Sequence, residues 1–163
     1  GRIIFPIKDI QGRITNFHGR FMYSDLDPRY KSIPENTPLP LFPAVVEPIN
    51  NSIILVEGLF DMLNLYDKGL KNTVCVFGTN IGLIKKKEKK KANLEKLLQY
   101  KYQGIETIYI MFDGDKSGRD AAKGLKSYID STFQVETIDL EDNMDPGKLT
   151  EQDVDKLRSV LYG

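Results

Sequence analysis

Short apolar runs alternate with segments of helical periodicity through most of the chain. The apolar runs are rich in β-branched and aromatic residues and predict buried strands over residues 52–56, 73–77, 107–112 and 134–140. Apolar residues at helical spacing predict helices over residues 59–66, 93–102 and 117–129, the second with Asn93 as its N-cap. Strands and helices that alternate in this way are typical of right-handed βαβ units. The pattern therefore predicts an α/β fold, with a mostly parallel four-stranded sheet flanked by helices.

The N-terminal residues follow a different pattern. Two β-prone runs, residues 2–7 and 14–18, are separated by a polar segment in which Asp9 and Gly12 provide turn chemistry. This arrangement predicts a β-hairpin. His18 ends the second run, and we expect a surface or hairpin histidine there rather than a catalytic one.

Prolines separate this hairpin from the rest of the chain. Six of the eight prolines lie in residues 25–48, which excludes long helices and central strands there. We therefore expect two parts: an N-terminal hairpin piece with a proline-rich connector, residues 1–48, and a main domain, residues 49–163.

Composition narrows the class of protein. The chain has 163 residues with 40% hydrophobic residues, which is ordinary for one globular domain. One cysteine and one histidine exclude an internal disulfide and a Cys/His zinc site, so no zinc is expected. No apolar run approaches the roughly 18 residues that span a membrane, so no membrane partner is expected.

The formal net charge is zero, but the charges are unevenly distributed. Between Lys85 and Lys101, eight lysines and two glutamates give a local net charge of +6. From Glu136 to the end, eight acidic and three basic residues give −5. Zero net charge therefore does not exclude nucleic acid as a partner. The run Lys85–Lys91 suits either a phosphate-backbone contact or a solvated loop or helix start.

Acidic residues follow two of the predicted strands. Glu57 comes directly after the first strand, and Asp113 and Asp115 follow the third. The carboxyl ends of parallel strands form the ligand-binding edge of an open sheet, and residues 113 and 115 can point the same way. Carboxylates that meet there repel one another unless a cation lies among them. Oxygen-only ligands favour Mg²⁺ or Mn²⁺, and Asp61 at the start of the next helix can add another carboxylate.

The Asp-Gly-Asp segment has two other interpretations. The same letters form surface turns. They also suit a hydrolase that forms an aspartyl phosphate on Asp113, but that class usually carries its motif on the first strand, followed by Gly-Thr. Here the motif follows the third strand, and Glu57 ends another strand, so a metal site next to a phosphate-binding helix start at Ser117 is favoured.

An ordered series of motifs resembles the Toprim (topoisomerase–primase) domain, in the version found in bacterial and phage DNA primases. Its core elements are Val56–Asp61, Gly78-Thr79 and Phe112–Gly118. Similar upstream and downstream segments extend the resemblance from about residue 2 to residue 149: they are Phe5–Arg20, Pro28–Glu35 and Leu140–Pro146.

The resemblance implies a Toprim-type fold and metal-dependent synthesis of RNA primers. It implies catalytic and metal-binding roles for Glu57, Asp113 and Asp115, with Asp61 and Asp145 completing an acidic cluster for Mg²⁺ or Mn²⁺.

The resemblance also implies partners. Arg20 and Arg29 match basic positions thought to contact template or nucleotide, and Lys31, Lys116 and Arg119 are further candidates for such contacts. The implied partners are single-stranded template DNA, ribonucleoside triphosphates and, through regions outside this chain, a replicative helicase. The implied location is the cytoplasm of a bacterium or of a phage-infected host.

Three features depart from the family pattern. Gly147 stands where bacterial primases usually have the second Asp of Asp-Pro-Asp, which puts the number of metals in question. Leu39–Phe42 replaces a His-Lys-Gly element and removes a basic contact. The lysine run has no counterpart.

A complete primase also carries a zinc module and a helicase-interacting part, so we expect an excised core or a pared-down viral relative. Two other functions stay open: a Toprim nuclease or topoisomerase-like cleavage of DNA, and a non-catalytic nucleic-acid-binding module.

Overall fold

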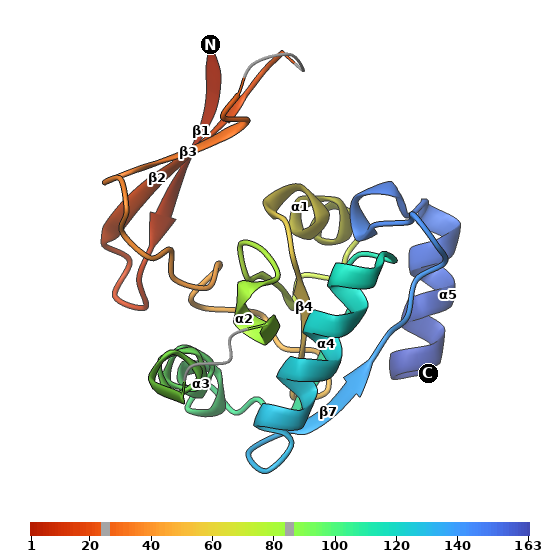
Figure 1. Ribbon diagram of the computed structural model, residues 1–163. Coiled ribbons are helices and arrows are strands. Elements are labelled where there is room, and N and C mark those ends of the chain that lie inside the picture. The colour runs from red at the N-terminus through yellow and green to blue at the C-terminus, as the bar shows by residue number, and fades with distance from the viewer. Residues whose placement is uncertain (24–26, 84–86) are drawn as a thin grey trace.

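A computed structural model describes residues 1–23, 27–83 and 87–163 and contains two separate β-sheets (Figure 1). The strands are β1 (Arg2–Lys8), β2 (Ile14–Phe21), β3 (Tyr30–Ile33), β4 (Ser52–Val56), β5 (Thr73–Cys75), β6 (Thr107–Ile110) and β7 (Gln134–Thr137). The helices are α1 (Leu59–Asp67), α2 (Asn80–Leu83), α3 (Lys87–Lys101), α4 (Lys116–Ile129), the 3₁₀ helix η1 (Pro146–Lys148) and α5 (Glu151–Tyr162).

The larger sheet is parallel, with strand order β5-β4-β6-β7. All five residues of β4 are buried, because helices cover both faces of this central strand. Ile53 and Leu55 pack into one core with residues of α3 and α4, and Ile54 and Val56 pack into another with residues of α1 and α5. The predicted four-stranded parallel sheet flanked by helices is confirmed.

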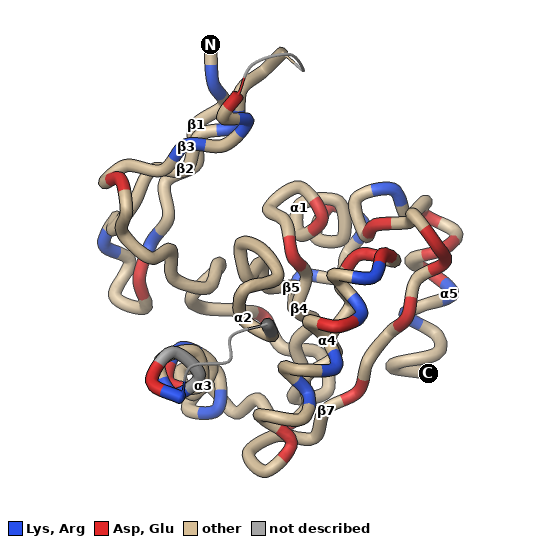
Figure 2. The backbone as a smooth tube through the Cα atoms, viewed as in Figure 1, with Lys and Arg blue, Asp and Glu red and all other residues tan. Residues whose placement is uncertain are grey.

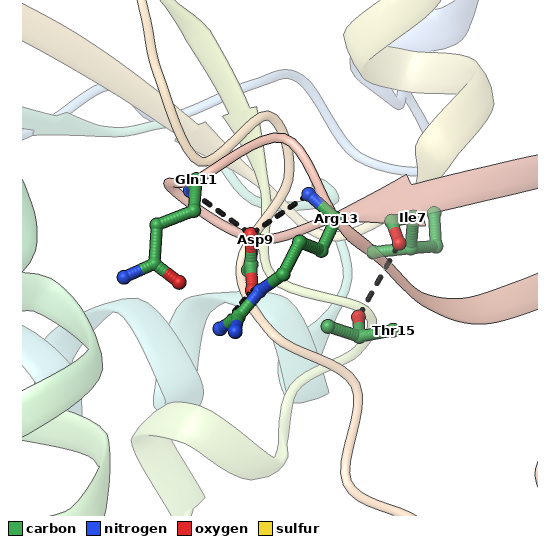
Figure 3. Close-up of polar contacts among 5 residues, drawn as sticks. All are labelled: Ile7, Asp9, Gln11, Arg13 and Thr15. Atoms are coloured by element: carbon green, nitrogen blue, oxygen red, sulfur yellow. Dashed lines mark hydrogen bonds and ion pairs between the residues drawn. The ribbon is translucent and has the colours of Figure 1, made fainter.

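The smaller sheet is antiparallel, with order β1-β2-β3. Asp9 builds the predicted turn between β1 and β2 (Figure 3): its Oδ1 accepts the backbone N–H groups of Gln11 and Arg13 at 2.9 and 3.0 Å, and its Oδ2 accepts Nε–H of Arg13 at 2.8 Å. Gly12 has φ +80°, which glycine adopts without strain. The hairpin prediction is therefore confirmed, although it missed a third strand.

That third strand comes from the proline-rich segment. β3 lies between Pro28 and Pro34 and pairs only with β2, so it is an edge strand. A short edge strand between two prolines is compatible with their missing N–H groups, whereas a central strand is not.

Several boundaries differ from the prediction. α3 begins at Lys87, so the prediction of Asn93 as an N-cap is wrong: Asn93 is buried within the helix and its Nδ2 donates to the carbonyl of Ile81 at 3.3 Å. The pattern also missed α2, η1 and α5. Lys85 and Lys86 of the lysine run lie outside the described residues. Among the described helices, none combines the length and apolarity that crossing a membrane demands.

Candidate active site

A cleft of about 920 Å³ lies between the N-terminal sheet and the carboxyl end of the parallel sheet. The parallel-sheet body contributes Glu57, Asp61, Asp113 and Asp145 to its lining. The N-terminal sheet contributes His18, Arg20, Arg29 and Tyr30. The fold thus brings four of the five predicted acidic residues and two of the predicted basic residues to one cavity, with charges of opposite sign on its two walls.

Glu57 joins the ends of two neighbouring strands. β4 and β6 pair in parallel register, so residues 57 and 113 both lie just beyond the paired ends. Oε1 of Glu57 accepts the backbone N–H of Asp113 at 3.0 Å. Oδ1 of Asp113 is buried and has no hydrogen-bond partner among the described residues. A buried carboxylate oxygen without a partner is costly, which marks this position as a site for a proton or a cation.

The carboxylates are held in unfavourable surroundings for their negative charge. Burial raises the pKa of Glu57 to about 7; the hydrogen bond from Asp113 opposes the rise, and the neighbouring carboxylates add to it. Burial also raises the pKa of Asp61 to about 6, with a further contribution from the charge of Asp113. The pKa of Asp113 is raised by burial and by the charges of Asp145 and Asp115. Neutralisation by a proton or a cation is therefore favourable here.

Asp61 and Asp145 connect the Asp145–Lys148 loop to the same cleft. Oδ2 of Asp61 accepts the N–H of Gly58 at 2.9 Å, and its Oδ1 accepts the N–H of Gly147 at 3.1 Å. Asp145 forms an ion pair of 2.7 Å with Lys148, which also lines the cleft. Figure 2 shows that acidic positions recur along the chain from β7 to α5, which includes this loop.

The opposite wall is basic and aromatic. The guanidinium of Arg20 lies 4.0 Å from the ring centroid of Phe60 and 5.8 Å from that of Tyr30, within the range of cation–π attraction. The ring of His18 stacks on Tyr30 at 5.2 Å and meets Phe77 edge-on at 5.0 Å. Phe60 belongs to α1 and Phe77 follows β5, so the two walls of the cleft meet at these contacts.

His18 lies in the hairpin, one of the two placements expected for it, and it is buried there. Only 7% of it is exposed, its Nδ1 lies 2.8 Å from Oγ of Ser32, and burial lowers its pKa. His18 is buried because this face of the sheet lies against the main body, where its ring contacts Phe77.

Four predicted site residues do not line the cleft. Asp115 is the N-cap of α4, and its Oδ1 accepts the N–H of Gly118 at 2.7 Å. The three basic residues form exposed ion pairs: Lys31 with Glu35, Lys116 with Asp120, and Arg119 with Asp142.

Sequence reasoning missed several lining residues. Phe60, Asn64, Phe77 and Lys148 line the cleft as well. Phe60 lies between Glu57 and Asp61 in the sequence, and Lys148 lies three residues after Asp145. Their closeness to these acidic residues could have indicated that they line the same site.

The chemistry of the acidic wall fits a hard divalent cation. Its donors are carboxylate oxygens, and one of them, Oδ1 of Asp113, is buried without a partner. Within residues 1–23, 27–83 and 87–163, however, no three His, Cys, Asp or Glu side chains are grouped as a metal site. The chemical type of these donors therefore fits Mg²⁺ or Mn²⁺, but the described residues do not form a complete set of metal ligands in advance.

Known proteins are similar to this chain in sequence. A family model of the Toprim domain matches residues 51–139. The DNA primase of Aquifex aeolicus is 30% identical over 161 residues, which cover 93% of this chain and 30% of that protein. The chain thus spans less than a third of this relative's length.

Solved structures show the same fold. The crystal structure of the Aquifex aeolicus primase (zinc binding and RNA polymerase domains) matches 98% of this chain and 39% of that one, with a TM-score of 0.73 and 29% identity. A primase catalytic domain solved bound to single-stranded DNA matches 97% of this chain and 50% of that one, with a TM-score of 0.70 and 26% identity.

Proposed function

The chain belongs to the Toprim domain family, and on that basis we propose that it forms the primer-synthesising site of a DNA primase. The reaction would join ribonucleoside triphosphates into short RNA primers on a single-stranded DNA template. The observation that carries this proposal is the cleft itself, in which an acidic wall of Glu57, Asp61, Asp113 and Asp145 lies opposite Arg20 and Arg29.

The acidic wall suits nucleotidyl transfer. Mg²⁺ or Mn²⁺ held by Glu57 and Asp113, with Asp115, Asp61 and Asp145 nearby, would neutralise the charge of the triphosphate and its leaving group. Burial raises the pKa of Glu57 to about 7 in the metal-free chain, and a bound cation would lower it, so this carboxylate would hold the cation in its charged form.

The basic wall suits the nucleic acid and the nucleotide. Arg20 and Arg29 line the cleft opposite the carboxylates, where guanidinium groups can bind phosphates in a bidentate manner. Tyr30 and Phe60 lie beside Arg20 and offer aromatic faces for stacking. Lys31, Lys116 and Arg119 lie outside the cleft, so contacts there would be to more distant phosphates.

The wider setting follows from the same proposal. A replicative helicase would bind through parts of a longer protein, and the site of action would be the cytoplasm of a bacterial cell or of a phage-infected host. These partners are proposed from the family, because the chain matches only part of its relatives.

One assay separates this function from the alternatives. The purified chain is incubated with single-stranded DNA, labelled ribonucleoside triphosphates and Mg²⁺ or Mn²⁺, alongside the Asp113→Asn variant. We expect short RNA products from the wild type and none from the variant. Cleavage of the DNA without nucleotides would instead support a nuclease. DNA binding that is unaffected by the loss of Asp113, with neither product, would support a binding module.

A further inference from the structure

The carboxylate of Asp61 is held between two glycines. Gly58 is the N-cap of α1, the helix that carries Asp61, and donates its N–H to Oδ2 of Asp61 at 2.9 Å. Gly147 lies in η1, 86 positions further along the chain than Asp61, and donates its N–H to Oδ1 at 3.1 Å. Both oxygens of Asp61 therefore accept backbone N–H groups from separate segments. Hydrogen bonds to a charged acceptor are stronger than neutral ones, so this carboxylate is a firm tie between the segments.

Both glycines are required for space. A Cβ atom on Gly58 would lie 2.6 Å from Oδ2 of Asp61, and one on Gly147 would lie 2.8 Å from Oδ1. Neither glycine has a positive φ, so backbone conformation does not explain the choice of residue. The absence of a side chain at each position lets the carboxylate approach the two N–H groups. A side chain at residue 147 would displace the far end of Asp61.

The tie acts on the loop that carries Asp145. The same Cβ atom on Gly147 would lie 3.1 Å from Oδ1 of Asp145, so the two carboxylates flank one small space. One turn further along α1, Nδ2 of Asn64 donates to the carbonyls of Pro146 and Leu149 at 2.9 and 3.0 Å. Helix α1 thus holds this loop at two points, and the Asp61 contact lies next to the carboxylate of Asp145.

We propose that Asp61 is a positioning residue, which fixes the Asp145–Gly147 loop against the start of α1, and that Gly147 is the residue that admits it. Asp61 acts through Asp145: it sets where that carboxylate meets the cleft. Its relevance to metal binding rests on the proposed function, whereas the tie itself does not. With glycine at position 147, the Asp145-Pro146-Gly147 segment lacks a second carboxylate, but its backbone N–H can bind Asp61 closely.

Amide hydrogen exchange of the metal-free chain tests the tie directly. We expect slow exchange of the Gly58 and Gly147 amides in the wild type. Asp61→Ala should accelerate both, each by about tenfold or more for the loss of a charge-assisted hydrogen bond. Asp61→Asn keeps one accepting oxygen and should accelerate only one. Unchanged exchange at both amides in either variant would overturn the proposal.

Gly147→Ala tests the requirement for space and removes no carboxylate. Alone, it should accelerate exchange of the residue 147 amide, because the new Cβ displaces Oδ1 of Asp61. Combined with Asp61→Ala, it should add nothing, since the group it displaces is already gone. Additive effects of the two substitutions would overturn the coupling.

Mn²⁺ binding, followed by electron paramagnetic resonance, separates positioning from mere structural support. Gly147→Ala should weaken Mn²⁺ binding by about tenfold, as the loss of a group that orients a ligand does. Val154→Ala, in the buried part of α5, is the matched control: it lowers stability and should leave Mn²⁺ binding unchanged. Equal losses in both variants would overturn the positioning role. No Mn²⁺ binding by the wild type would count against the proposed function, while the exchange experiment still decides the tie.

Discussion

The backbone N–H of Asp113 donates a hydrogen bond of 3.0 Å to Oε1 of Glu57, although the two residues are 56 positions apart in the chain. This contact fixes one oxygen of the Glu57 carboxylate at the junction of β4 and β6. The acidic wall of the cleft is therefore built on two neighbouring strand ends, which the core packs firmly on both faces. Such rigid support is what a catalytic carboxylate needs.

Asp113→Asn should abolish Mn²⁺ binding and lower primer synthesis by at least about 100-fold, because it removes a charge that would face the metal. The fold should persist, since the Glu57 contact uses the backbone N–H of residue 113 and not its side chain. Mn²⁺ titration measures metal binding, a primer-synthesis assay measures activity, and circular dichroism shows whether the fold persists. Synthesis at the wild-type rate would refute the metal role.

The stability of the metal-free chain should fall as pH rises from about 4 to about 7. The pKa of Glu57 is about 7 and that of Asp61 about 6 in the folded chain, above the values of about 4 that unfolded carboxyls have. The folded state therefore favours the protonated forms, and their stabilising contribution, complete at low pH, is lost as each group ionises.

Thermal melting at several pH values measures this effect. Glu57→Gln should flatten the profile, and saturating Mg²⁺ should raise the melting temperature most near pH 8, where the carboxylates are charged. Stability that increases over this pH range equally in the wild type and in Glu57→Gln would contradict the assignment.

Gly118→Ala should displace the Glu57 carboxylate and the backbone of Asp113. A Cβ atom on this residue of α4 would lie 2.2 Å from the backbone carbonyl oxygen of Asp113 and 2.8 Å from Oε1 of Glu57, so both groups would have to shift. We expect a loss of roughly 1–3 kcal/mol in the free energy of unfolding, as overpacking usually costs, together with reduced primer synthesis. Urea denaturation gives the first quantity. Lys123→Ala, on the exposed face of the same helix, is the control and should change neither.

Arg20→Ala should weaken binding to single-stranded DNA, because Arg20 supplies positive charge to the wall opposite the carboxylates. If it neutralises one phosphate, the slope of log affinity against log salt should become shallower by about 0.7. Fluorescence anisotropy over a salt series measures the slope. Lys156→Ala, exposed on α5, is a matched loss of charge that should leave the slope unchanged. Equal slopes for the wild type and Arg20→Ala would exclude the contact.

The local pattern of apolar residues was sufficient to predict the strands of the parallel sheet. β4 has the same bounds as its apolar run, because a strand buried on both faces is nearly continuously apolar. Its one polar residue, Ser52, is buried and donates its hydroxyl to the carbonyl of Ile49. Helices whose polarity is more mixed were harder to place. α3 begins in a run of lysines with no apolar periodicity, so only its second half resembled a helix in the sequence.

The sequence by itself determined the α/β class and the placement of Glu57 and Asp113 at strand ends, because both follow from short-range periodicity. Only the tertiary structure decided which of the other candidates face the cleft. Asp115 caps α4, Asp61 is held between Gly58 and Gly147, and His18 is buried against Phe77. The Asp115–Gly118 and Asp61–Gly58 contacts are local helix caps. The Asp61–Gly147 and His18–Phe77 contacts instead join distant segments, and no local pattern of residues encodes that proximity.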